Sequence, residues 1–237
     1  MSQEVTEKIA EKIWKNECGG KLEALTCWNE GESFGSFGIG HFIWYPAGEK
    51  KFFQETFPEL LKFFQNAGIV LPSWLSEADG CLWPSREAFY ENFHSQKMVV
   101  LRDLLLRTKN LQASFIVSKV EKVFKEIEER LAKDKRGAVL QAFHQLTRNP
   151  NGMYALVDYL NFKGAGISPE EAYQGYGWGL LQVLQGLSPN ADDVVADFAA
   201  SAKKVLARRV ANSPPGRHEE RWLKGWYNRI NTYLELF

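Results

Sequence analysis

The sequence predicts a mainly α-helical protein with one small β-hairpin. Over most of the chain, apolar residues recur every three or four positions, as they do on the buried face of an amphipathic helix. Residues 34–45 instead mix glycines with β-branched and aromatic residues, which is typical of a glycine-interrupted hairpin. With 237 residues and 45% apolar content, the chain is long enough to bury a sizeable core.

The first helix is predicted to end at Gly19-Gly20. Ahead of these glycines, Val5, Ile9 and Ile13 recur every fourth residue and form one apolar stripe. Glu17 therefore falls in the last turn, where the negative end of the helix dipole disfavours an ionised carboxylate. A carboxyl that keeps its proton is a candidate proton donor, although a solvated surface glutamate is the simpler interpretation of the position alone.

The other helices are predicted from the same spacing and from capping residues. Ser85 is a candidate N-cap. The segment 168–171, Ser-Pro-Glu-Glu, is a capping box with proline at the first helical position, which predicts a helix start at Ser168. The remaining helical stretches are expected at residues 52–66, 85–105, 115–133, 138–146 and 154–160.

The charge balance and the hydropathy exclude several classes of protein. Lys plus Arg and Asp plus Glu number 29 each, so no overall field attracts polyanions, and we expect no nucleic-acid partner. No stretch reaches the roughly 18 uncharged apolar residues of a membrane span, so we expect no membrane partner. The first residues, MSQEVTEKIAEKIW, contain no apolar run typical of a signal peptide.

Cysteine and histidine usage predicts neither a metal site nor a cofactor. The three cysteines, Cys18, Cys27 and Cys81, lack metal-ligand spacing and are expected as free thiols, with a Cys18–Cys27 bridge left open. The histidines are scattered, without the i, i+4 pair of zinc hydrolases. The glycine spacing around Ser36 does not fit a nucleophile elbow.

Residues 14–46 hold the densest set of candidate catalytic groups. Glu17 is followed by the polar turn Asn29-Glu30-Gly31-Glu32-Ser33 and then by the glycine-rich hairpin, whose missing side chains leave room for a ligand. Two carboxylates on either side of a bound sugar are what glycoside hydrolysis needs. One is protonated as the acid, and the other is ionised as base or electrostatic partner.

This stretch resembles the catalytic region of phage-type lysozymes, which belong to the lysozyme-like superfamily. In that family a Glu ends the first helix, an Asp follows in a turn, and, after five residues, a Thr precedes an Ile-Gly-Ile-Gly-His-like strand. Here Glu17 matches the acid, Glu30 stands at the position of the Asp, and Ser36 replaces the Thr before residues 37–41, Phe-Gly-Ile-Gly-His. The spacer between Glu17 and Glu30 is longer than in the family, and Glu32 competes for the second role.

A second similarity lies near the C-terminus. Residues 213–217, Ser-Pro-Pro-Gly-Arg, and the aromatic segment with Trp222 and Trp226 are similar to the Pro-x-Arg motif and terminal helix of the phage-lysozyme C-lobe. The resemblance therefore covers both ends of the chain and is weak in the middle. It implies a lysozyme-like, two-lobed helical fold as a single domain over residues 1–237, with the hairpin in a small lobe at about residues 18–80.

The resemblance implies a glycosidase that cleaves β-1,4 linkages of peptidoglycan or a related amino-sugar polymer. Glu17 would be the general acid, Glu30 or Glu32 the base or electrostatic partner, and Ser36 would help to hold the attacking water. A lytic transglycosylase that uses one acid, and a non-catalytic relative that binds glycan or protein, are the alternatives. We expect a monomer. A wall hydrolase acts in the periplasm or outside the cell, although no signal peptide is visible here.

Four further residues are candidates for contact with the sugar chain. His41 ends the motif of the resemblance, and its alternative role is a structural hydrogen bond under the hairpin. Tyr176 and Trp178 are interleaved with glycines, which leaves ring faces open for stacking, whereas the competing interpretation is close helix packing at those glycines. Asn161 precedes a second glycine-rich segment and is a polar candidate.

Overall fold

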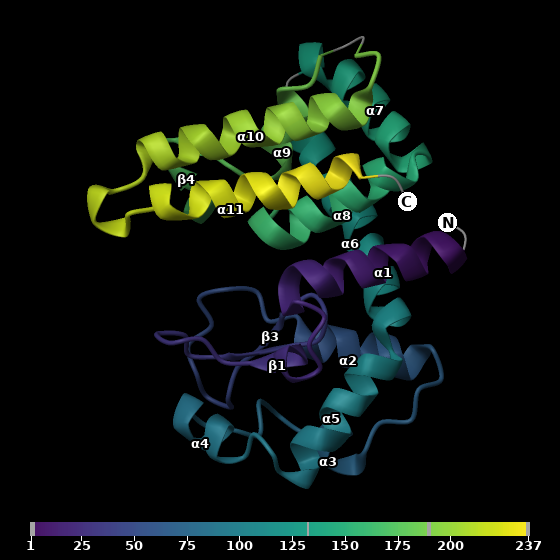
Figure 1. The fold of residues 1–237 in the computed structure, drawn as a ribbon, viewed down its shortest axis with the longest axis vertical. Helices are drawn as coiled ribbons and strands as arrows, with labels where there is room; N and C mark the ends of the chain where they lie inside the picture. The colour runs from purple at the N-terminus through teal and green to yellow at the C-terminus, as the bar shows by residue number, and fades with distance from the viewer. Residues whose placement is uncertain (1–2, 132, 189–190, 236–237) are drawn as a thin grey trace. The chain divides into compact units, whose positions relative to one another are not determined.

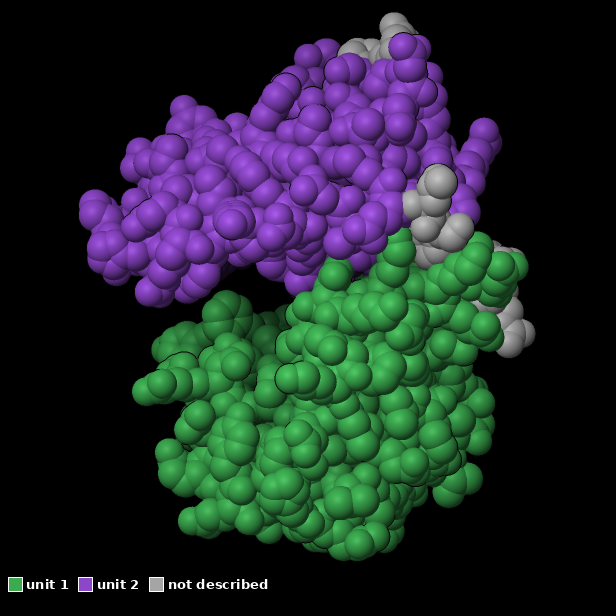
Figure 2. Space-filling model, in the orientation of Figure 1, with its two compact units in different colours: residues 1–116 green, residues 117–237 purple. Residues whose placement is uncertain are grey.

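The computed structural model describes residues 3–131, 133–188 and 191–235 and shows a mainly helical chain (Figure 1). The predicted fold class is confirmed at this level. The chain divides into two compact units, residues 1–116 and 117–237, which Figure 2 draws in green and purple. The helix α6 (Lys109–Arg130) contains the boundary between them. The small lobe expected at about residues 18–80 lies inside unit 1.

Unit 1 combines short helices with a small antiparallel sheet whose strand order is β1-β2-β3. The β2–β3 hairpin was predicted, whereas β1 is only two residues long and shows no alternation in the sequence. In chain order the unit contains α1 (Gln3–Cys18), the 3₁₀ turn η1 (Glu23–Leu25), β1 (Thr26–Cys27), β2 (Gly35–Phe37), β3 (Phe42–Trp44), α2 (Phe57–Asn66), α3 (Ser73–Ser76), α4 (Arg86–Glu91), α5 (Gln96–Arg107) and the start of α6.

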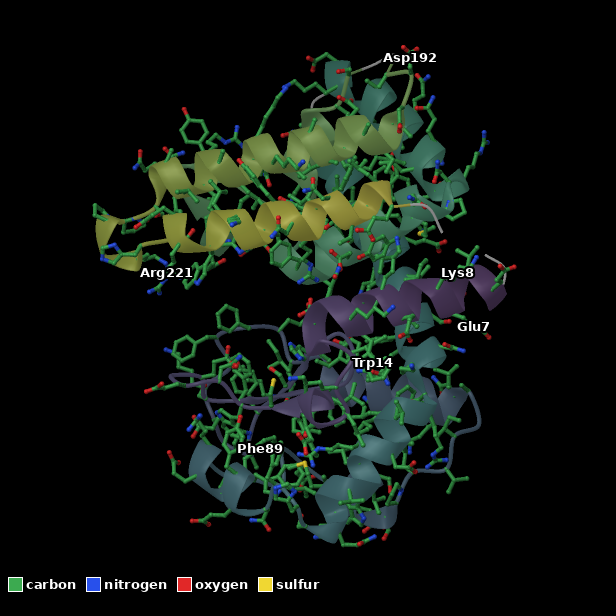
Figure 3. All side chains as sticks on the ribbon, viewed as in Figure 1. Glu7, Lys8, Trp14, Phe89, Asp192 and Arg221 are labelled. Carbon is green, nitrogen blue, oxygen red and sulfur yellow. The ribbon has the colours of Figure 1, made fainter. Side chains whose placement is uncertain are left out.

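The two faces of this sheet have different roles. Residues paired directly across antiparallel strands share a face, so Thr26, Phe37 and Phe42 point to one side. On that side Phe37 is fully buried and packs on Phe57 and Phe89, with ring centroids 4.9 and 6.1 Å away. Phe89 lies among the interior side chains of unit 1 in Figure 3. This face is the core of the unit, and the opposite face is left for the site.

Helix α1 ends as the sequence predicts. Ile9 and Ile13 are fully buried, so the apolar stripe faces the core. Gly19 and Gly20 both have positive φ, and their N–H groups donate to the carbonyls of Lys15 and Trp14. Glycine in this left-handed conformation is the common way to end a helix. The break fixes Glu17 in the last turn of α1.

The helical stretch predicted at 85–105 is two helices. Ser85 is the N-cap of α4, since its hydroxyl accepts from the N–H of Ala88 at 3.3 Å. The Asn92 side chain then donates to the Ala88 carbonyl at 2.9 Å, and Ser95 serves as a second N-cap for α5. Asparagine and serine compete with the backbone in this way at helix ends. The apolar stripe alone does not reveal such a break.

Unit 2 is built around α8, in which residues 154–159 are all buried. A helix that is buried all round lies at the centre of its unit. None of the helices in the described parts of the chain is both long and apolar enough to cross a bilayer. In chain order unit 2 contains the rest of α6, α7 (Lys133–Arg148), α8 (Pro150–Lys163), η2 (Pro169–Glu171), β4 (Ala172–Tyr173), β5 (Tyr176–Gly177), α9 (Leu180–Gln185), α10 (Val194–Asn212), η3 (Pro215–Arg217), α11 (Glu220–Asn231) and η4 (Thr232–Leu234).

The prediction of a helix from Ser168 is wrong. Only the 3₁₀ turn η2 forms there, and the β4–β5 hairpin follows it. The Glu171 carboxylate accepts from the N–H groups of Gly166 and Ile167, which fastens the preceding loop. Gln174 and Gly175 both have positive φ, which is the requirement of a two-residue hairpin turn. The chain therefore turns into the β4–β5 hairpin, and the capping box at Ser168 does not start a longer helix.

Two fully buried carboxylates hold unit 2 together. Glu219 accepts from Arg209 at 2.7 and 2.9 Å, from Arg217 at 3.2 Å and from the Tyr173 hydroxyl at 2.8 Å. Burial acts to raise the pKa of Glu219, but the hydrogen bonds from Arg209 and Tyr173 and the nearby positive charges lower it below its usual value. Asp158 receives two hydrogen bonds from Arg229, both at 2.9 Å, and one from Tyr233 at 2.8 Å.

We predict that Asp158→Asn strongly destabilises the protein. The substitution leaves the Arg229 guanidinium, whose side chain is only 12% exposed, without its carboxylate. Removing one partner of a buried ion pair costs about 3–5 kcal/mol, measured as the free energy of unfolding in urea. Asp103→Asn is the control, because its pair with Arg107 is 59% and 66% exposed and contributes at most about 1 kcal/mol. Equal losses in the two variants would contradict the prediction.

Candidate functional site

The carboxyl of Glu17 lies against the imidazole of His41. Glu17 Oε2 is 3.5 Å from His41 Nδ1, and the Glu17 side chain is only 14% exposed. Glu17 comes from the last turn of α1, and His41 comes from the turn between β2 and β3. The contact therefore joins the two halves of the predicted motif and holds Glu17 beside the hairpin.

The other ring nitrogen of His41 also faces protein groups. His41 Nε2 is 3.4 Å from the Ala24 carbonyl oxygen, 3.7 Å from Cys18 Sγ and 3.9 Å from Cys27 Sγ. Both nitrogens thus have protein neighbours, which agrees with the structural role considered for this histidine. Glu17, Cys18, Cys27 and His41 form one group of side chains, called the Glu17 cluster below.

A buried glutamine fixes the turn that carries His41. Gln112 of α6 is fully buried, and its Oε1 accepts from the Ile39 N–H at 2.8 Å while its Nε2 donates to the Leu105 carbonyl at 2.6 Å. Gly38 has a φ of +75°, and a Cβ there would lie 2.3 Å from Gln112 Oε1. Glycine is therefore required at this position for both reasons. The place of His41 depends on the Gln112 amide.

Ser36 lies on the sheet face that carries the cluster. It pairs with Cys27 on one side and Ile43 on the other, so the three side chains share a face. Cys27 in turn contacts His41. Ser36 itself is only 4% exposed. The pairing of β1 with β2 thus places Ser36 near the Glu17 cluster, but its side chain lies beneath the protein surface.

The two candidates for the second acid have different surroundings. The Glu32 carboxylate accepts from the Asn29 side chain at 3.1 Å, and its charge, like that of Glu17, raises the pKa of the Cys27 thiol. Glu30 is exposed, and no such effect on the cluster is seen for it. Glu32 therefore shares the electrostatic neighbourhood of Glu17.

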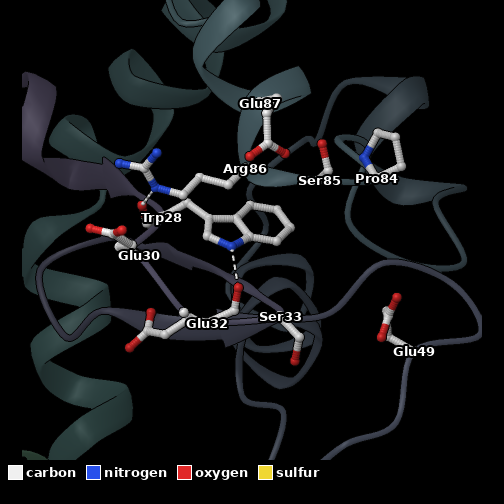
Figure 4. A pocket seen from close by; sticks show the side chains of 10 residues that line it. Trp28, Glu30, Glu32, Ser33, Glu49, Pro84, Ser85, Arg86 and Glu87 are labelled. Atoms are coloured by element: carbon white, nitrogen blue, oxygen red, sulfur yellow. Dashed lines mark hydrogen bonds between the residues drawn. The ribbon is translucent and has the colours of Figure 1, made fainter.

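Glu30 and Glu32 border an open pocket of about 360 Å³ (Figure 4), and none of the four residues of the Glu17 cluster lines it. The Trp28 indole forms part of its wall and donates to the Glu32 carbonyl at 2.8 Å. Arg86 Nε donates to the Trp28 carbonyl at 3.0 Å, which ties the acidic turn to α4. The lining residues are Trp28, Glu30, Gly31, Glu32, Ser33, Glu49, Pro84, Ser85, Arg86 and Glu87.

The thiols of the cluster are neutral at physiological pH. Burial, followed by the charges of Glu32 and Glu17, raises the pKa of Cys27 to about 11. Burial, followed by the charges of Glu17 and Cys27, raises the pKa of Cys18 to about 12. Both cysteines are free, and within the described residues no group of three or more His, Cys, Asp or Glu side chains is arranged to hold a metal ion. The thiols therefore act beside His41 as weakly polar, uncharged groups.

The remaining candidates, Asn161, Tyr176 and Trp178, belong to unit 2 and not to the Glu17 cluster. Tyr176 is 54% exposed and has an accessible ring. Trp178 is only 7% exposed, and its ring is covered by Tyr173 at 4.5 Å and by the Arg209 guanidinium at 4.1 Å. Trp178 therefore has a packing role. Asn161 lies near the C-terminal end of α8 and is partly exposed.

Sequence reasoning did not assign Cys18, Cys27 or Gln112 to the site. Cys27 enters the cluster through the pairing of β1 with β2, and a two-residue strand leaves no periodic signal. Gln112 lies more than seventy residues after the turn that it holds. A polar residue inside an apolar helical stripe was the one available sign of a buried hydrogen-bond partner.

The chain matches no known family model, no curated protein and no solved structure. Its function is therefore argued from the chemistry of the site.

We predict that Gln112→Leu destabilises the protein and loosens the turn. Leucine is of similar size but leaves the buried N–H of Ile39 without an acceptor, which costs about 1–3 kcal/mol in the free energy of unfolding. Ser114→Ala on the same helix is the control, because its hydroxyl makes an exposed hydrogen bond to Asn110 and its loss changes stability by about 0.5 kcal/mol or less. An unchanged urea midpoint in Gln112→Leu would show that the amide does not hold the turn.

We also predict that Glu32→Gln accelerates alkylation of Cys27, whereas Glu30→Gln does not. Removing the Glu32 charge lowers the pKa of the thiol, so more thiolate is present at a given pH. We expect the alkylation rate to rise about twofold at about pH 8. The measurement is the rate of iodoacetamide labelling of the peptide that contains Cys27, followed by mass spectrometry. A larger effect from Glu30→Gln would reverse the assignment of the two acids.

Proposed function

We propose that this protein is a glycoside hydrolase with a lysozyme-like fold that cleaves β-1,4 linkages of an amino-sugar polymer such as peptidoglycan. The observation that carries the proposal is the shielded carboxyl of Glu17, 14% exposed and 3.5 Å from His41 Nδ1. A solvated surface glutamate has no such fixed neighbour. A carboxyl held in place beside a glycine-rich hairpin suits a general acid.

In this proposal Glu17 protonates the glycosidic oxygen as the bond to the leaving sugar breaks. His41 supports that role through the hydrogen-bonding pattern of its ring. The Ala24 carbonyl can only accept, so it favours a proton on His41 Nε2. In the neutral ring Nδ1 is then an acceptor, which suits a Glu17 carboxyl that carries its proton.

Glu32 is the proposed base or electrostatic partner. Its charge acts on Cys27 together with that of Glu17, and Asn29 orients its carboxylate. Glu30 is exposed at the pocket rim and is the weaker candidate. Ser36 lies on the same sheet face as Cys27 but is only 4% exposed, so it is a weak candidate for positioning the attacking water. A carboxyl separation of roughly 5–5.5 Å gives retention of configuration and roughly 6.5–9.5 Å gives inversion.

A lytic transglycosylase is the second candidate, because among the three candidate acids, all in the described chain, Glu17 alone contacts His41 through its side chain. In that reaction a hydroxyl of the sugar itself attacks the anomeric carbon, and a single acid suffices. Digestion in water labelled with ¹⁸O distinguishes the hydrolase from the lytic transglycosylase. Hydrolysis places one heavy oxygen at each new reducing end, whereas intramolecular attack places none.

We predict that Glu17→Gln lowers the turnover of purified peptidoglycan about 10²-fold or more, the size of effect expected for a general acid. Glu4→Gln is the matched control, because Glu4 lies on the same helix with a side chain 76% exposed and should leave turnover unchanged. Equal activity of wild type and Glu17→Gln would remove Glu17 from the mechanism. Absence of turnover in all three proteins would support the non-catalytic, binding relative instead.

A further inference from the structure

Unit 2 carries an aromatic and cationic surface that the proposed chemistry does not use. We call it the Trp222 patch, and it consists of Phe162 and Lys163 at the end of α8 and Arg221, Trp222 and Trp226 on α11. Trp222 is 41% exposed, which is unusual for so large an apolar side chain. Its ring centroid is 6.2 Å from that of Trp226, which in turn is 6.4 Å from that of Phe162. The aromatic rings therefore form one continuous row.

Cations flank this row. Lys163 Nζ lies 3.6 Å from the Trp226 centroid and 3.9 Å from that of Phe162, and Arg221 Cζ lies 4.6 Å from that of Trp222. These are cation–π distances. The inner arginines, Arg209 and Arg229, are neutralised by Glu219 and Asp158.

Arg221 differs from the inner arginines. In the described part of the chain no Asp or Glu side chain lies within ion-pair distance of its guanidinium. Figure 3 shows Arg221 at the start of α11, with its side chain extending away from the helix. The charge beside Trp222 is therefore available to a ligand.

A glycine keeps the surface beside Trp222 open. Gly225 is exposed in the middle of α11, three residues after Trp222 and four after Arg221, so it adjoins both on the helix surface. A Cβ at Gly225 would meet nothing within 4 Å. Glycine at such a position costs a helix about 0.5–1 kcal/mol relative to alanine. Contacts within the described protein do not require this glycine, whereas an approaching ligand would benefit from it.

We propose that the Trp222 patch binds an anionic polysaccharide, with a sugar ring over Gly225 against the Trp222 indole and a carboxylate of the polymer on Arg221. An aromatic face suits the apolar C–H face of a pyranose. A guanidinium binds a carboxylate through two parallel hydrogen bonds. The identity of the polymer rests on the proposed function: in peptidoglycan every second sugar bears a short peptide with free carboxylates, so the patch is a second binding point for the same polymer.

The size of the patch argues against a membrane surface as its ligand. An interfacial helix inserts a broad apolar face with several large side chains. Here Trp222 is the one strongly exposed aromatic residue of α11 in the described chain, since Trp226 is half-buried between Phe162 and Lys163. One stacked ring with one ionic contact fits a single sugar unit.

The test is cosedimentation of the full chain with purified peptidoglycan and with chitin, which has the same β-1,4 amino-sugar backbone without the peptide and its carboxylates. All proteins carry Glu17→Gln so that the polymer stays intact. We expect tighter binding to peptidoglycan than to chitin. Trp222→Ala should weaken peptidoglycan binding about tenfold or more, as at other tryptophan anchors. Arg221→Gln should lower peptidoglycan binding toward the chitin level and leave chitin binding unchanged.

Three substitutions at Gly225 form a matched series. Gly225→Ala should keep binding and raise thermal stability, since the methyl group meets open space. Gly225→Gln should weaken binding by filling the space beside Trp222. Gly225→Glu has the same shape with a negative charge and should weaken binding further. Unfolding in urea verifies that every variant is folded.

Wild-type affinity for peptidoglycan in both Trp222→Ala and Gly225→Glu would overturn the proposal. Equal affinity for chitin and peptidoglycan would overturn it as well. Binding to phosphatidylglycerol vesicles that depends on Trp222, without peptidoglycan binding, would replace it with a membrane role. Peptidoglycan binding that depends on Trp222, in a protein whose Glu17-bearing form shows no turnover, would support the patch and refute the hydrolase. Turnover that depends on Glu17, without any effect of Trp222→Ala on binding, would support the hydrolase and refute the patch.

Discussion

The hydrogen bond from the Ile39 N–H to the side chain of Gln112 is the interaction on which the candidate site depends. It pins a turn whose Gly38 has no room for a side chain, and that turn places His41. His41 in turn holds the carboxyl of Glu17. A buried amide that lost one of these bonds would leave a polar group unsatisfied, so the turn has one favoured geometry. The positions of Glu17 at the end of α1 and of His41 in the hairpin turn thus depend on a third element, α6.

The acidic side chains of this protein fall into two kinds according to their partners. Glu219 and Asp158 are fully buried, and each faces arginine and tyrosine donors. Arginine stays charged at all relevant pH values, so such partners keep a carboxylate ionised and make it a structural element. Glu17 faces histidine, whose ring nitrogens can either donate or accept a hydrogen bond. The partner of Glu17 is therefore not a permanent positive charge, in contrast to the arginine partners of Glu219 and Asp158.

The sequence was sufficient for features that depend on local pattern. The stripe of Ile9 and Ile13, the glycines after Cys18 and the β2–β3 hairpin all follow from periodicity and backbone freedom, and they place Glu17 correctly. Features that depend on pairing between distant segments were missed. The register that puts Cys27 beside Ser36 is one of them. The helix predicted from Ser168 failed because a positive-φ turn at 174–175 outweighed the capping signal.

The high pKa values of the two thiols around His41 have a consequence for the redox chemistry of the protein. Oxidants such as hydrogen peroxide attack the thiolate and not the thiol. With a pKa of about 11, Cys27 is ionised at neutral pH in about one molecule in ten thousand. Cys18, with a pKa of about 12, is ionised still more rarely. The raised pKa values of both thiols therefore disfavour sulfenic acid formation around His41.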